Sequence, residues 1–145
     1  MRTKYAATTE NAGFLLAKAS QRFNELLTQG LAAKGYAEVR PSYGSVLVPL
    51  FAEGDLRIGE IADRARLSKQ AITGLVKLCE ADGLVTRADD PRDGRAFRIS
   101  LTGRGRRLQA AAETTLAELD GEIVARLGAR KRDALIEALK GVMDL

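Results

Sequence analysis

The 145-residue sequence contains no histidine and a single cysteine, Cys79. Without histidine, neither a Ser-His-Asp triad nor a Cys-His pair can form. One cysteine also excludes an internal disulfide and a zinc site built from Cys and His ligands of this chain. Tryptophan is absent, and four Phe and three Tyr leave few rings to line a large cofactor pocket. We therefore expect no cofactor and no metal, although composition alone leaves catalysis by carboxylates open.

Long apolar runs are missing as well. No segment approaches the roughly 18 consecutive apolar residues of a membrane-spanning helix, and 29% of the residues are charged. The first 14 residues lack the apolar stretch and the cleavage site of a secretory signal. We expect a cytoplasmic protein with no membrane association. Its length and its 46% apolar content suit one domain with helical appendages.

Helical periodicity dominates what is present. Apolar residues recur at three- and four-residue spacing from Thr9 to Lys34, which predicts an amphipathic helix that stops at Gly35. A second helix is expected from Pro41 to Gly54, with a kink at Pro49. Further helices are predicted over residues 58–66, 68–82, 102–127 and 130–143, with Ser68 and Thr102 as N-caps.

The period changes from 3.6 to 2 after Gly83. Alternation over 85–87 and 97–101 predicts two β-strands. The intervening segment, ADDPRDGR, is rich in turn formers, and its Asp93-Gly94 pair is expected to form the tip of a hairpin. The apolar residues of the second strand that we expect to point into the core are Phe97, Ile99 and Leu101. A short helix, a turn, a longer helix and a hairpin together follow the plan of a winged helix-turn-helix.

The helix predicted over 68–82 has two different faces. Its apolar side carries Ile72, Leu75, Val76 and Cys79, and its polar side carries Gln70, Thr73, Gly74 and Lys77, with Lys69 beside them. The polar side has no acidic residue before Glu80, so it offers amides, hydroxyls and ammonium groups that suit base edges and phosphates. An ordinary solvated face is the alternative. We expect Cys79 to be a buried small hydrophobe rather than a redox sensor.

Gly74 lies in the middle of this predicted helix, where glycine is unfavourable. Glycine there costs roughly 1 kcal/mol relative to alanine. Either something outside the protein approaches the polar face closely, or a neighbouring element of the protein packs against it.

Positive charge is concentrated in the middle of the chain. Residues 57–107 hold 12 basic and 7 acidic side chains, whereas the rest of the chain holds 11 and 12. This is the electrostatic pattern of a domain that binds a polyanion. An arginine near the hairpin tip can enter a narrow minor groove, and we expect Asp93 to hold Arg95 extended through a carboxylate–guanidinium pair. A solvated loop without a partner is the alternative.

The terminal helices carry apolar stripes that a winged domain of about 50 residues cannot cover. The helix over 102–127 is roughly 38 Å long, and its stripe comprises Leu108, Ala112, Leu116, Leu119, Ile123 and Leu127. We expect the terminal helices to pack against a two-fold copy of themselves; an intrachain three-helix bundle is the alternative. The expected organisation is an N-terminal dimerisation helix over 1–40, a winged helix-turn-helix DNA-binding domain over 41–107, and C-terminal dimerisation helices over 108–145.

Residues 56–108 resemble the multiple-antibiotic-resistance regulator (MarR) family of bacterial transcription factors. The resemblance rests on Ile61-Ala62, the helix start Ser68-Lys69-Gln70, the segment LCEADGLV, the hairpin sequence DPRDGR and the Leu101-Thr102-x-x-Gly105 helix start. It implies a mainly α fold with a small β-wing, and a homodimer on a palindromic operator in double-stranded DNA. It also implies repression of nearby genes, often with release by a small aromatic or phenolic ligand.

The resemblance further implies site residues. DNA-binding residues would be Ser68, Lys69, Gln70, Thr73 and Lys77 on the recognition helix, with Asp93 and Arg95 on the wing. The cluster of basic residues in the wing sequence adds Arg92 to this set. Candidate ligand-lining residues are Phe14, Phe23, Tyr36 and Tyr43, although each also suits a core. We expect no enzyme, because no carboxylate pair, phosphate-binding glycine loop or nucleophile arrangement is present. A winged helix that binds protein instead of DNA is the alternative function.

Overall fold

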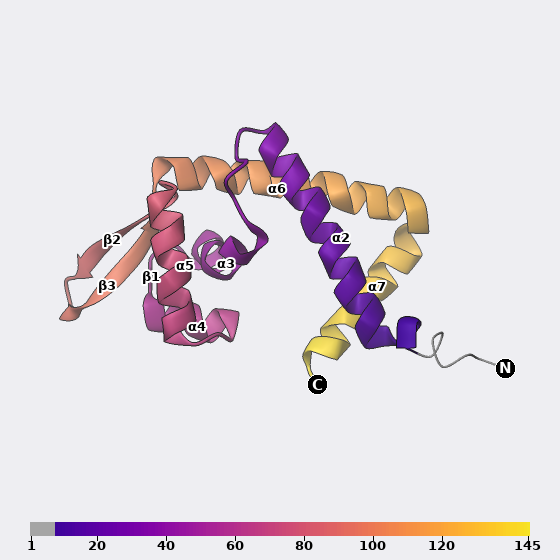
Figure 1. Cartoon of the computed structure of the whole chain (residues 1–145), viewed down its shortest axis with the longest axis horizontal. Helices are drawn as coiled ribbons and strands as arrows, with labels where there is room; N and C mark the ends of the chain where they lie inside the picture. Colours follow the sequence, from indigo (N-terminus) through magenta and orange to yellow (C-terminus); the bar gives the residue numbers. More distant parts are fainter. Residues whose placement is uncertain (1–7) are drawn as a thin grey trace.

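The computed structural model describes residues 8–145 (Figure 1). Its elements are α2 (Ala12–Ala33), the 3₁₀ helix η1 (Pro41–Tyr43), α3 (Gly44–Glu53), β1 (Leu56–Arg57), α4 (Ile58–Ala65), α5 (Lys69–Ala81), β2 (Val85–Asp90), β3 (Asp93–Leu101), α6 (Gly103–Leu127) and α7 (Ala129–Met143). The strands form one antiparallel sheet in the order β1-β3-β2. The predicted class, mainly α with a small β-wing, is confirmed. Residues 1–7 of the predicted N-terminal dimerisation segment lie outside the described residues.

Polar caps begin the two helices that frame the hairpin. Ser68 Oγ accepts a hydrogen bond from the backbone N–H of Ala71 at 3.1 Å, and Thr102 Oγ1 accepts one from Gly105 at 3.0 Å. Both caps were predicted from the sequence. The helix expected from Pro41 is divided instead, because Pro41 opens the 3₁₀ turn η1 and α3 follows from Gly44.

The core of the winged domain lies where α3, α4, α5 and the sheet meet. Ile61, Ile72, Cys79 and Ile99 are fully buried there, and Leu108 joins α6 to the same core. The prediction for Cys79 is confirmed: burial raises the pKa of its thiol to about 12. A thiol that stays protonated is a poor nucleophile.

The hairpin turns earlier than the sequence predicted. The strands pair from Val85 opposite Leu101 to Asp89 opposite Phe97, and Asp90 then pairs with Asp93. Pro91 and Arg92 therefore form the turn, and residues 94–96 have no partner in this register. The prediction that Asp93-Gly94 forms the tip is wrong. Proline after aspartate suits the first half of a turn, and Asp90 Oδ1 accepts a hydrogen bond from the Arg92 N–H at 2.8 Å.

Phe97 does not point into the core, contrary to the prediction. Its side chain is 43% exposed, and the Arg87 guanidinium carbon lies 5.5 Å from the centre of its ring. The physical reason is the reach of the hairpin, which projects beyond the helices of the winged domain and leaves both faces of its outer part in solvent (Figure 1). Ile99 and Leu101, closer to the base, are packed in or against the core as expected.

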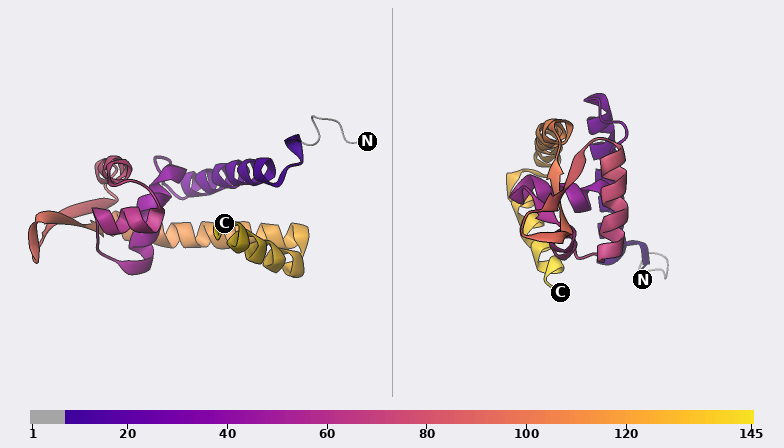
Figure 2. Two further views of the ribbon diagram at one scale, coloured as in Figure 1. Left: turned by 90° about the horizontal axis from the view of Figure 1, so that it is seen from below. Right: turned by 90° about the vertical axis from the view of Figure 1, so that its left-hand side faces the viewer.

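The terminal helices form an open arm. α2 packs on α6, and α6 packs on α7, but α7 has no buried residue. α2 and α7 overlap in Figure 1 and lie apart in Figure 2, so the intrachain bundle is not formed. The apolar residues left exposed, which we call the arm surface, are Phe14, Leu15, Leu116, Leu127, Leu135, Ile136, Leu139, Val142 and Met143. None of the helices in residues 8–145 is long and apolar enough to span a membrane.

Candidate nucleic-acid interface

The outer face of α5 is open to solvent along its length. Ile72, Val76 and Cys79 hold the helix against the core, while Gln70, Gly74 and Lys77 are exposed on the other side. A Cβ on Gly74 would meet no heavy atom within 4 Å. Packing by a neighbouring element therefore does not explain this glycine.

Three of the polar residues predicted to bind DNA, Ser68, Lys69 and Thr73, lie at the N-terminal end of α5. Thr73 is half-buried, and its hydroxyl donates to the carbonyl oxygen of Lys69 at 2.8 Å. The Lys69 stem lies across the start of α4, where a Cβ on Gly59 would come within 3.2 Å of Lys69 Cε. The Ser68 hydroxyl that caps the helix still carries a donor. These groups, with the positive end of the helix dipole, make a surface suited to an anion.

The acidic residues at the other end of α5 are both engaged by the protein. Glu80 accepts two hydrogen bonds from the Arg87 guanidinium, at 2.8 and 3.2 Å, and the bonding to Arg87 holds the pKa of Glu80 below its ordinary value. Asp82 accepts a hydrogen bond from the Tyr43 hydroxyl at 2.5 Å. The Glu80–Arg87 pair also joins α5 to β2, so this helix and the hairpin are held together.

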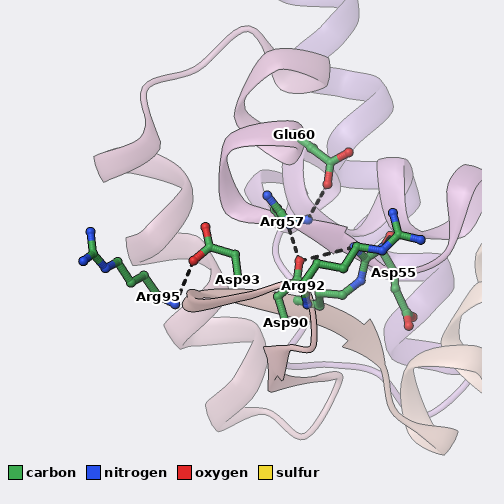
Figure 3. Close-up of polar contacts among 8 residues, drawn as sticks. Asp55, Arg57, Glu60, Asp90, Arg92, Asp93 and Arg95 are labelled. Carbon is green, nitrogen blue, oxygen red and sulfur yellow. Dashed lines mark hydrogen bonds and ion pairs between the residues drawn. The ribbon is translucent and has the colours of Figure 1, made fainter.

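Arg95 is extended on the wing, but not by the predicted contact. Asp93 Oδ1 accepts a hydrogen bond from the backbone N–H of Arg95 at 3.0 Å, so the expected carboxylate–guanidinium pair is wrong. A short aspartate side chain reaches the N–H two residues ahead more readily than a long, mobile guanidinium. Figure 3 shows the Arg95 side chain running away from the hairpin. Arg92 is also exposed.

A buried carboxylate anchors the wing turn, and the sequence reasoning missed it. The Asp90 side chain is 1% exposed, and its Oδ2 accepts from Arg57 Nε at 2.6 Å and lies 3.6 Å from Arg98 Nη1 (Figure 3). The hydrogen bond from the Arg92 N–H, followed by the one from Arg57, holds the pKa of Asp90 below its ordinary value. The available signal was Asp90 as the first aspartate of the DPRDGR segment.

Comparison with known proteins decides the family. The sequence model of the MarR family matches residues 50–96. The homoprotocatechuate degradative operon repressor of Escherichia coli is 33% identical over 100 residues, which cover 68% of each chain. The chain belongs to the MarR family. Membership makes it a winged-helix transcriptional regulator, and it does not support the alternative of a protein-binding module.

Two other regulators are also similar to this MarR-family protein. The exopolysaccharide II synthesis transcriptional activator ExpG of Rhizobium meliloti is 31% identical over 66% of this chain, and the match spans about half, 49%, of ExpG. The transcriptional repressor CouR, solved bound to a 23-mer DNA duplex, superposes with a TM-score of 0.83 at 26% identity and covers 99% of both chains. The fold and the order of elements are thus shared over the whole described chain.

An apolar cavity of about 120 Å³ lies where the arm meets the winged domain of this MarR-family protein. It is bounded by Leu27 and Leu31 of α2, Leu47 and Phe51 of α3, and Leu108 and Ala112 of α6, with Arg40 and Glu113 also on its wall. Because four separate segments build it, no local pattern in the sequence could show it.

The four aromatic residues predicted to line a ligand site are not brought together. Tyr43 is buried in the core, and Tyr36 packs under the Arg104 guanidinium, 4.9 Å from ring centre to guanidinium carbon. Phe14 is exposed on α2 and Phe23 is half-buried. None of the four is on the wall of the apolar cavity. The ring-lined site expected from the sequence is therefore not formed by these four residues, and the cavity is lined mainly by aliphatic side chains together with Phe51.

Proposed function

We propose that two copies of this protein bind one palindromic operator in double-stranded DNA. In each copy α5 lies in the major groove and the wing reaches into the adjacent minor groove. The observation that carries this proposal is the open outer face of α5, which has no carboxylate before Glu80 and no neighbour above Gly74. The proposed DNA-binding residues are Ser68, Lys69, Gln70, Thr73, Lys77, Arg92, Asp93 and Arg95.

The proposed homodimer follows from the arm surface. Its apolar side chains are well exposed, at 38% for Phe14, 51% for Leu15 and 66% for Met143, and this much exposed apolar surface is unfavourable in water. A two-fold copy of the same helices would cover it with like residues. We therefore assign residues 1–40 and 108–145 to dimerisation and residues 41–107 to DNA binding.

We further propose that the protein represses nearby genes and is released from DNA by a small aromatic acid or phenol. An engineered apolar cavity of roughly 150 Å³ is known to hold a benzene ring, so the cavity of about 120 Å³ suits a single ring. Arg40 on its wall offers a partner for a carboxylate. Such a regulator works in the cytoplasm, on the nucleoid when bound to DNA, and needs no catalytic activity.

Selection of bound sites from random duplex DNA tests the proposal. We expect a palindromic consensus whose half-sites lie about 10 bp apart, one turn of the double helix. A pool with no enriched sequence would contradict it. A variant with Lys69→Ala and Lys77→Ala is the matched control and should enrich nothing. In a separate arm, benzoate, 4-hydroxybenzoate and phenol are tested for release of the selected DNA.

A further inference from the structure

The short helix η1 lies between the apolar cavity and the recognition helix. Its first residue, Pro41, is on the cavity wall, as is Gly44, which follows it. Its last residue, Tyr43, is only 2% exposed, and its hydroxyl donates to Asp82 Oδ2 at 2.5 Å. Asp82 is the C-cap residue of α5. A single turn of the chain therefore touches both the cavity and the end of the recognition helix.

The geometry of a 3₁₀ helix makes this turn a link between two sites. Successive residues of such a helix point about 120° apart, so Pro41 and Tyr43 face different directions from the same rigid turn. η1 contacts both α2 and α5. A displacement of the cavity wall at Pro41 therefore also moves the phenol ring of Tyr43.

We propose that Tyr43 and Asp82 are positioning residues that tie the C-terminal end of α5 to the wall of the cavity. When a molecule fills the cavity, η1 shifts and Tyr43 carries the shift to α5. The inference rests on the proposed function, because its output is the placement of α5 in the major groove.

The pair is suited to this role by its chemistry. A hydroxyl that donates to a carboxylate makes a charge-assisted hydrogen bond, which is shorter and stronger than a neutral one. The bond to Asp82 is the main cause that raises the pKa of Tyr43 to about 12, so the hydroxyl keeps its proton at physiological pH. Asp82 also lies at the far end of α5 from Ser68, Lys69 and Gln70.

The length of α5 turns a small shift into a change in DNA reading. Thirteen residues make a helix about 20 Å long. Because the middle of the helix is packed into the core at Ile72 and Val76, a shift at one end tilts the other. Hydrogen bonds to bases tolerate only about 0.5 Å in length, so a displacement of about 1 Å is enough to lose one.

A ring placed in the cavity by mutation tests the inference without knowledge of the natural ligand. Ala112 is on the cavity wall, and Ala110 is exposed on the same helix. Ala112→Phe fills the cavity, and Ala110→Phe is the matched control. Each is combined with Tyr43→Phe, which removes one hydroxyl and keeps the ring. Tyr36→Phe removes the hydroxyl of another buried tyrosine and leaves the Tyr43–Asp82 bond intact.

The first readout is amide hydrogen exchange in DNA-free protein. The N–H groups of Asp82, Gly83 and Leu84 bond to carbonyl oxygens of α5, and they report on the end of this helix. We expect Ala112→Phe to raise their exchange at least fivefold relative to amides in the middle of α5. Ala110→Phe should leave the ratio unchanged. In the Tyr43→Phe background, Ala112→Phe should change it less than twofold, whereas in the Tyr36→Phe background the full effect should persist.

The second readout is affinity for the selected operator. Ala112→Phe should weaken binding about tenfold, and Tyr43→Phe should remove most of that effect. Equal effects of Ala112→Phe with and without the Tyr43 hydroxyl would overturn the inference, as would a folded Ala112→Phe variant that changes neither readout. Ala112→Leu serves if the phenylalanine variant does not fold. If no operator exists, the proposed function fails. Amide hydrogen exchange then still tests whether Tyr43 and Asp82 link the cavity wall to α5.

Discussion

The substitution Gly74→Ala should stabilise this protein and weaken its binding to DNA. Gly74 lies in the interior of α5, where glycine costs roughly 1 kcal/mol relative to alanine because it loses more backbone freedom on folding. The added methyl would meet no heavy atom within 4 Å. We therefore expect the free energy of unfolding to rise by about 0.5–1 kcal/mol, which corresponds to a rise in Tm of about 1–4 °C for a chain of this length.

The same methyl lies on the face that we propose enters the major groove. A dimer presents it twice, once in each half-site. A cost of about 0.7 kcal/mol at each half-site already amounts to tenfold in affinity, so we expect binding to weaken at least tenfold. Stability and function should thus move in opposite directions, which a general folding defect cannot produce.

Urea unfolding measures the first effect, and fluorescence anisotropy with the selected operator at fixed salt measures the second. Gly121→Ala is the matched control, because Gly121 is also an exposed helical glycine with open space around its Cβ position. It should show a similar gain in stability and unchanged affinity. Wild-type affinity in Gly74→Ala would refute the reasoning, since DNA would then not approach this face closely.

Four further predictions follow from the site and the arm. Arg95→Ala should lower operator affinity tenfold or more with Tm unchanged, and Arg95→Lys should restore only part of it, because lysine lacks the planar fork; anisotropy titrations and thermal melts check both. Gln70→Ala should relax base preference at one symmetric pair of operator positions by about 1–3 kcal/mol, and unchanged preference in a repeated selection would mean that Gln70 does not read a base. The pKa of Asp90 is lowered in the folded protein, so its stabilising charge acts above the unfolded pKa of about 3.9 and is lost as the pH falls through the folded pKa. Asp90→Asn should therefore reduce the loss of unfolding free energy below about pH 4. If urea unfolding at a series of pH values shows the same loss in the variant as in the wild type, the prediction is contradicted. Leu139 is exposed on α7, so Leu139→Glu should yield folded monomers by light scattering, whereas a persistent dimer would place the interface elsewhere.

Signals that act over a few residues were readable from the sequence. Ser68 and Thr102 cap their helices as predicted, because a cap depends only on the residue and the N–H three positions ahead. The outward face of α5 was also predictable, since its apolar and polar residues separate at the helical period. The burial of Cys79 was predictable from the same apolar stripe.

Features that depend on the whole fold were not readable in this way. Two turn signals overlap in the hairpin, and the burial of Asp90 against Arg57 favours the one at Pro91-Arg92 over the one at Asp93-Gly94. Phe97 alternates correctly with its neighbours, yet its environment depends on how far the hairpin reaches past the helices. The cavity is assembled from segments that are distant in sequence, so its aliphatic lining at residues such as Leu47 and Ala112 had no local signature.

The order of the sheet has a consequence for the protein when it is not on DNA. β2 is an edge strand, and an unpaired edge is a template on which another chain can add a strand. Here Arg87 and Asp89 place charges along that edge, and the opposite edge, β1, is only two residues long. The wing, which projects into solvent, is thereby protected from pairing with the wing of another molecule. Arg87, which joins β2 to α5 through its ion pair with Glu80, thus also helps to keep free copies of the protein from aggregating edge to edge.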